Sequence, residues 1–114
     1  MKSIIRNNRK GICYICRRVI PTEEHHIFGG PNRKLSERYG LKVYLCTYCH
    51  RDNKNGAHGS REIADHLHRI GQTAFERSHT REEFMEIFGK NYLDDSMQKG
   101  NEEFGIIWIN LQEN

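Results

Sequence analysis

Two Cys-x-x-Cys pairs are the residues whose type and spacing point most directly to chemistry. Cys13 and Cys16 form the first pair, and Cys46 and Cys49 form the second. A turn of this spacing brings two thiolates onto one metal ion, and zinc takes four sulfur or nitrogen ligands in a tetrahedron. Two pairs fill that shell and leave no position for water, so we expect a structural zinc site. Disulfides and a rubredoxin-like iron are the alternatives; without a recognisable secretory leader, zinc is favoured over disulfides.

Four histidines near these cysteines are free for a second kind of chemistry. His25 and His26 are adjacent, His50 follows Cys49 directly, and His58 lies further along the chain. Neutral imidazoles bind divalent cations and accept protons near neutral pH, although a lone histidine is more often structural. Hydrolysis of a phosphodiester needs a base for water, a Lewis acid and cations that stabilise negative charge. The grouping is therefore consistent with a hydrolytic metal site.

The order of these motifs resembles the HNH family of nucleases. The chain reads His-His-Ile-Phe-Gly-Gly from residue 25 and Leu-Cys-Thr-Tyr-Cys-His from residue 45. The resemblance covers residues 13 to about 58 and extends to small HNH proteins encoded by bacteriophages and prophages. It implies an α+β fold: two antiparallel strands and a helix around one divalent metal, with the zinc site and additional C-terminal helices. The implied activity is metal-dependent endonucleolytic hydrolysis of DNA.

The resemblance also implies roles for individual residues. His25 matches the family's first metal ligand, His26 its general base and His50 its second metal ligand. Mg²⁺, Mn²⁺, Ni²⁺ and Zn²⁺ are the candidate catalytic cations, and imidazole ligands favour the softer ones. Lys54 stands one helical turn after His50, where some members of the family have a lysine that faces the phosphate.

The chain departs from the family at the middle asparagine, which orients the base in other members. Gly40, Leu41 and Lys42 stand in that region. Asn32 and Asn53 are the candidate substitutes. Because such supporting residues matter for a metal site, the absence of the middle asparagine would reduce or abolish activity.

Three more residues are candidates for phosphate contact. His58 would contact phosphate or add a metal ligand, and is otherwise a loop residue. Arg33 and Lys34 follow the glycines and would lie along a phosphate backbone, unless they only form a solvated face.

Hydrophobic periodicity predicts two strands that position the histidines. Residues 22–28 are typical of a strand that ends at a Gly-Gly-Pro sequence, and residues 41–45 alternate as a half-buried strand does. Neighbouring side chains of a strand point to opposite faces. His25 and His26 can therefore serve one site only if the strand bends or ends there.

Helix signals follow each strand. Residues 32–40 predict a polar connection with one short helical turn ended by glycine, and residues 49–56 predict one to two turns. The clearest helix opens at Ser60 and carries one apolar stripe, and a capping-box pattern starts another helix at Thr80 that ends at Gly89.

Length and composition limit the chain to one small domain, whose modest core needs a metal site or disulfides for stability. It has 114 residues, of which 36% are hydrophobic. We expect a basic arm over residues 1–10, the metal-bearing domain over residues 11–93 and an extension over residues 94–114. Residues 104–109 of the extension predict a short strand, which packs on its own domain or offers a surface to a second copy or another protein.

The charge distribution points to a polyanionic partner. Residues 1–61 carry 13 Lys and Arg against 4 Asp and Glu, whereas residues 62–114 carry 5 against 11. A basic half around the metal motifs suits DNA, although a solvated basic surface is the plainer interpretation. The longest apolar run is too short to span a bilayer, so we expect no membrane partner and a reducing cytoplasm, that of a bacterial host if the protein is phage-encoded.

Two other functions stay open from sequence. A catalytically silent zinc module would bind nucleic acid or protein and use its histidines for packing. An iron held by the four thiolates would transfer electrons.

Overall fold

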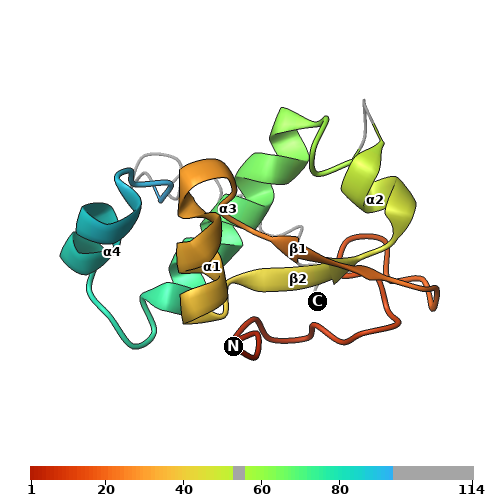
Figure 1. The fold of residues 1–114 in the computed structure, drawn as a ribbon, viewed down its shortest axis with the longest axis horizontal. Coiled ribbons are helices and arrows are strands. Elements are labelled where there is room, and N and C mark those ends of the chain that lie inside the picture. Colours follow the sequence, from red (N-terminus) through yellow and green to blue (C-terminus); the bar gives the residue numbers. More distant parts are fainter. Residues whose placement is uncertain (53–55, 94–114) are drawn as a thin grey trace, which may run out of the picture.

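A two-stranded antiparallel sheet lies at the centre of the protein (Figure 1). The computed structural model describes residues 1–52 and 56–93. Strand β1 spans Glu23–His26 and β2 spans Lys42–Leu45, with His25 opposite Val43 and His26 opposite Lys42. The two predicted strands are present. β1 ends earlier than predicted, because the Phe28 amide leaves the sheet and donates to the Ser36 hydroxyl at 2.9 Å.

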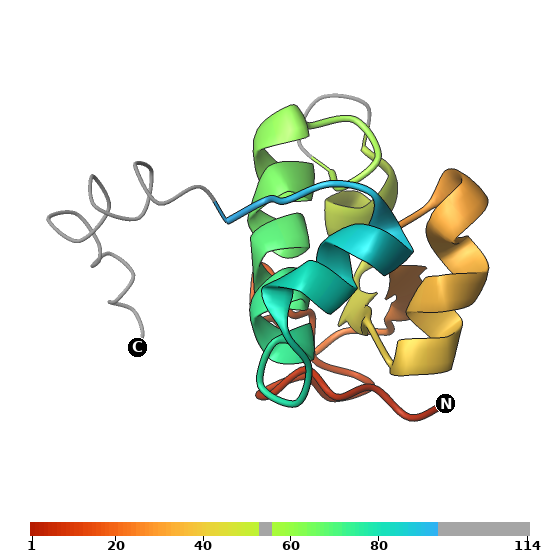
Figure 2. The same ribbon diagram turned by 90° about the vertical axis from the view of Figure 1, so that its left-hand side faces the viewer.

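Helices surround this sheet and make the protein a small mixed α/β structure. In chain order they are the 3-10 helix η1 (Gly30–Asn32), α1 (Arg33–Tyr39), α2 (Thr47–Arg51), α3 (Arg61–Phe75) and α4 (Arg81–Phe88). The strands lie between α3 and α1 (Figure 2). The connection between the strands, predicted as a single turn, is the seven-residue helix α1, and it ends as predicted at Gly40 with φ 70°.

Helix α2 begins between the two cysteines of the second pair. Cys46 stays extended and serves as the N-cap, with φ −72° and ψ 165°. The amide of His50 donates to the Cys46 carbonyl at 2.9 Å, which closes the first helical turn. The helix therefore starts earlier than predicted and ends earlier as well, at Arg51. As a result, Cys49 and His50 are neighbours on one short helix.

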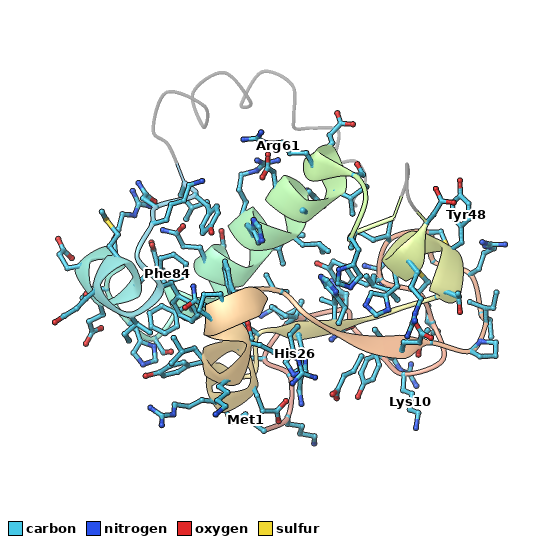
Figure 3. The ribbon with its side chains drawn as sticks, turned by 45° about the horizontal axis from the view of Figure 1, so that its top comes forward. Met1, Lys10, His26, Tyr48, Arg61 and Phe84 are labelled. Atoms are coloured by element: carbon cyan, nitrogen blue, oxygen red, sulfur yellow. The ribbon has the colours of Figure 1, made fainter. Side chains whose placement is uncertain are left out.

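The two C-terminal helices begin where the sequence predicted. The Ser60 hydroxyl accepts from the Ile63 amide at 3.2 Å, and Thr80 and Glu83 form a reciprocal capping box. α4 ends at Gly89 with φ 83°. Figure 3 shows Phe84 of α4 directed inward and Arg61, at the start of α3, directed outward.

The hydrophobic core lies between the sheet and α3 and α4. Its largest fully buried apolar side chains are Phe75, Phe84, Leu41, Leu45, Leu67 and Val43. α3 comes very close to the end of β1 at Gly71, where a Cβ atom would lie 2.9 Å from the Phe28 ring. This contact fixes the strand that carries the paired histidines.

The basic N-terminal segment lies along β2 and is tied to it. The Ile4 amide donates to the Gly40 carbonyl at 2.9 Å, and the Tyr44 amide donates to the Asn8 side-chain carbonyl at 2.9 Å. Ile5 is buried in the core. The basic segment over residues 1–10 is therefore part of the fold.

Among the described residues, no helix has the length and apolar character needed to cross a membrane. The short strand predicted over residues 104–109, Lys54 and Asn53 lie outside the described residues.

Candidate metal and hydrolytic site

The four cysteines come together from two distant parts of the chain. Cys13 and Cys16 lie in a tight turn closed by the Arg17 amide, which donates to the Cys13 carbonyl at 2.9 Å. Cys46 follows β2 as the N-cap of α2, and Cys49 lies on α2. The four sulfur atoms all lie within 4.8 Å of one another, and all four thiols are free. This geometry is compatible with a structural metal site such as zinc.

The thiols differ in how easily they ionise without a metal. Burial opposes ionisation of Cys16, but hydrogen bonds from the Arg18 side chain and backbone and from the neighbouring thiols outweigh it and lower the Cys16 pKa to about 6. The Arg18 Nε atom lies 3.4 Å from the Cys16 sulfur. Burial and the adjacent cysteines raise the pKa of Cys49. A bound cation would favour the thiolate form of all four, with release of protons.

Three of the four singled-out histidines form a second cluster. His25 comes from β1, His50 from α2 and His58 from the loop before α3, and one ring nitrogen of each lies within 4.8 Å of the others. The Nε2 atoms of His50 and His58 are 2.9 Å apart. His25 and His50 are each 8% exposed, whereas His58 is exposed. The structure thus brings together the two predicted ligands and adds His58.

Glu23 fixes the orientation of the His50 ring. Its carboxylate accepts a hydrogen bond from His50 Nδ1 at 2.7 Å and another from Arg51 Nε at 2.9 Å. These two donors, His50 first, lower the pKa of Glu23. Because the Nδ1 atom carries the proton, Nε2 presents its lone pair to the cluster. A carboxylate behind a histidine in this way is a common feature of metal sites.

Two rings of the cluster, His25 and His58, are held in the neutral form that binds metals. Burial, followed by the charges that His50 and His58 would carry, lowers the pKa of His25 to about 3. Burial and the same kind of repulsion from His50 and Arg51 lower the pKa of His58. At neutral pH these two rings therefore offer unprotonated nitrogens, which fits a divalent cation.

A cavity of about 370 Å³ opens beside this cluster. It is lined by the three clustered histidines together with Glu24, His26, Gly29, Gly30, Arg33 and Arg51. The cavity is large enough for a phosphate group and water next to the imidazoles, and two guanidinium groups border it. The arrangement can therefore hold a cation and a phosphodiester at one place.

His26 lies on the opposite face of β1 from His25. The strand is regular at this point, so the two rings separate as alternation requires. His26 Nε2 donates to Glu37 of α1 at 2.9 Å, and Lys42 Nζ lies 3.1 Å from both oxygens of the same carboxylate. His26 shares the cavity with the cluster but does not belong to the cluster.

The remaining predicted site residues are placed in different ways. Arg33 lines the cavity, whereas Lys34 is exposed and does not line it. The Asn32 amide donates to the Phe88 carbonyl of α4 at 3.2 Å and does not line the cavity, so it supports packing between helices and not the base. Lys42, which stands in the region of the missing asparagine, pairs with His26 across the sheet.

Glu23 and Glu37 were not singled out from the sequence. Glu23 precedes His25 by two residues on the same strand, so alternation alone places both on one face. Glu37 reaches His26 from another element, and no local pattern indicates that contact.

No family model, curated protein or solved structure matches this chain. The resemblance to HNH nucleases therefore rests on the motif residues alone.

Proposed function

We propose that this protein is a metal-dependent endonuclease of the HNH type that hydrolyses DNA phosphodiester bonds. The observation that carries the proposal is the convergence of His25, His50 and His58 beside a cavity that His26 and Arg33 also line. The separated motifs of the sequence meet in space with the residue types that this hydrolysis requires.

The clustered histidines would hold one divalent cation. The depressed pKa values of His25 and His58 and the Glu23 contact to His50 keep ligand nitrogens available. When bound there, such a cation would supply Lewis acidity to the phosphate and the leaving oxygen. The guanidinium of Arg33, which borders the cavity, would contact a phosphate oxygen.

His26 would serve as the general base from the other side of the strand. Because Glu37 accepts from Nε2–H, the basic nitrogen of the ring is Nδ1. Nδ1 would take a proton from the water that attacks phosphorus. The bond between phosphorus and the 3′-oxygen would break, and that oxygen would take a proton from solvent to give a 3′-hydroxyl. Glu37 would then stabilise the protonated ring, and Lys42 holds Glu37 in place.

The four cysteines would bind a structural zinc, with no role in hydrolysis. A filled tetrathiolate shell leaves no position for substrate or water. Purified protein should be colourless and contain about one zinc per cysteine cluster; a red preparation with visible absorption would identify iron instead.

Cleavage of supercoiled plasmid tests the proposed activity. We expect the wild-type protein to nick plasmid with Mg²⁺, Mn²⁺ or Ni²⁺, and the His26→Ala variant to lose this activity by about 100-fold or more. His79→Ala is the matched control, because His79 lies between α3 and α4 and does not line the histidine cavity. Thermal melts of each variant separate loss of chemistry from loss of folding.

A silent zinc module is the second candidate, and one observation favours it. His26 faces away from the histidine cluster and its Nε2 is occupied by Glu37. If folded, zinc-loaded protein binds DNA but does not nick it with any of these cations, the silent module is the correct function.

A further inference from the structure

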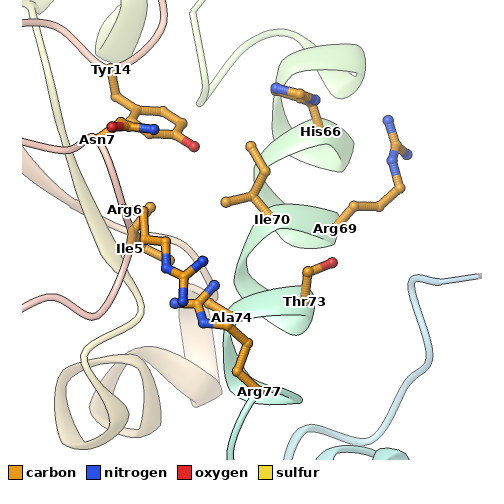
Figure 4. A pocket seen from close by; sticks show the side chains of 10 residues that line it. All are labelled: Ile5, Arg6, Asn7, Tyr14, His66, Arg69, Ile70, Thr73, Ala74 and Arg77. Atoms are coloured by element: carbon orange, nitrogen blue, oxygen red, sulfur yellow. The ribbon is translucent and has the colours of Figure 1, made fainter. Parts of the chain in front are cut away.

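A second cavity lies between the N-terminal segment and α3. It measures about 350 Å³ and shares no lining residue with the histidine cavity. Figure 4 shows Arg6 and Tyr14 on the side of the N-terminal segment, with Ile70 and Arg77 on α3 and just beyond its end. The neighbouring segments are joined by the Arg77 guanidinium, which donates to the Ile4 carbonyl at 2.8 Å.

This cavity is strongly basic. Arg6, Arg69 and Arg77 line it, and none of its described lining residues is acidic. Within the part of the chain that the structure describes, none of the three arginines forms an ion pair with a carboxylate. Other arginines nearby do: Arg61 pairs with Asp65, and Arg81 with Glu76. Grouped cations without a counter-charge attract an anion.

Because the cations are arginines, the cavity suits a phosphate group. A guanidinium presents a planar fork of donors that matches phosphate oxygens, and it is charged at every physiological pH. In Figure 4 the Arg6 and Arg77 guanidinium groups project toward the same side of the cavity. Two such groups from separate elements suit consecutive phosphates or two oxygens of one phosphate.

The rest of the lining suits a nucleotide better than a bare inorganic ion. Ile5, Ile70 and Ala74 give the cavity an apolar surface, and Tyr14 adds an aromatic ring. Burial raises the pKa of Tyr14, partly opposed by Arg17, so the hydroxyl keeps its proton and can donate to an acceptor. Aromatic and apolar surface beside arginines is typical of sites that hold a nucleic-acid strand.

We propose that this cavity binds the phosphate backbone of a nucleic-acid strand, with Arg6, Arg69 and Arg77 as the phosphate contacts. The site anchors the strand away from the histidine cluster. The proposal rests on the nucleic-acid partner of the proposed function, but it does not depend on hydrolysis.

Binding of a fluorescein-labelled DNA oligonucleotide, followed by anisotropy without added divalent cation, tests this site. We expect Arg6→Ala and Arg69→Ala each to weaken binding about tenfold and to reduce the slope of log K against log salt by about one. Arg61→Ala is the matched control, since it lies on the same helix and removes the same charge outside the cavity. Arg77 is avoided because its contact to Ile4 supports the fold.

Each outcome separates this site from the proposed activity. Equal, small losses for Arg6→Ala, Arg69→Ala and Arg61→Ala would overturn the site and show a general charge effect. No binding by the folded wild-type protein would overturn it as well. Selective losses support the site even if plasmid is never nicked. If the wild-type protein nicks plasmid but Arg6→Ala and Arg69→Ala bind DNA as tightly as it does, the proposed activity is supported and the proposed phosphate site is contradicted.

Discussion

The cysteine cluster and the histidine cluster are built alike but differ in what lies beside them. Each gathers its ligand atoms within 4.8 Å, and each joins a residue of α2 to residues from other parts of the chain. The sulfur atoms, three of them on buried residues, have no open side in a four-ligand shell. The imidazoles number three and face a cavity of about 370 Å³. A filled ligand shell stabilises a fold, whereas an incomplete shell beside a cavity leaves room for a substrate.

Removal of a cysteine should have the largest effect if this contrast is correct. We expect Cys46→Ser to lower the free energy of unfolding by several kcal/mol, because binding energy at a structural site is folding energy. Thermal melts and metal content report the change. His58→Ala should fold normally, and a Cys46→Ser protein of unchanged stability and zinc content would contradict the structural role.

If the histidine cluster binds a cation as proposed, removal of one of its histidines should weaken that binding and leave the fold intact. We expect His25→Ala to weaken Co²⁺ or Mn²⁺ binding at this cluster by about 100-fold or more, since one of three ligands is lost. Calorimetry on zinc-loaded protein measures the affinity, with His79→Ala as the control. Equal affinities for the two variants would show that the histidines are not ligands.

Substitution of Glu23, which contacts His50, should weaken cation binding less than loss of a clustered histidine does. Glu23→Gln removes the charged acceptor behind His50 but keeps the shape of the side chain, so cation affinity should fall about 10- to 100-fold. Glu62→Gln, an exposed carboxylate in the first turn of α3, is the matched control. Zinc content and melting temperature should not change, and a drop in either would mean that Glu23 supports the fold instead.

The smallest expected effect is a loss of folding stability at acid pH. The folded pKa of His25, about 3, lies below the ordinary imidazole value of 6.5, so the unfolded chain binds a proton first as pH falls. The stability of protein without a cation in the histidine cluster should decrease between pH 6.5 and 3, by about 1–2 kcal/mol from pH 7 to pH 5. Urea unfolding across this range measures it. His25→Gln should remove most of the decrease, and an unchanged pH profile would contradict this assignment.

Local patterns in the sequence predicted most of the scaffold. Alternation placed β2, capping residues placed the starts of α3 and α4, and Cys-x-x-Cys spacing predicted the sulfur cluster. Each of these signals lies within a few neighbouring residues. The extent of α1 was missed because its polar sequence has no clear apolar stripe.

The parts of the site that depend on distant contacts could not be predicted. The path of the chain between α2 and α3 decides whether His58 reaches His50, and its sequence leaves that path open. The sequence showed that His25 and His26 could serve one site only if the strand bends or ends there. The register of the sheet was needed to show that the strand is regular and that the two rings separate. Arg6 and Arg77 line the same basic cavity although they are distant in the sequence. They come together because the N-terminal segment is hydrogen-bonded to Arg77 through the Ile4 carbonyl.

Helix α2 carries a ligand of each cluster on consecutive residues, Cys49 and His50. If both clusters bind cations as proposed, a cation on the four cysteines would preorganise the histidines, and the cysteine cluster should be filled first. A chelator strong enough to strip the thiolates would also release the ion between the imidazoles. A weak chelator would empty only the imidazoles and leave a folded, refillable protein.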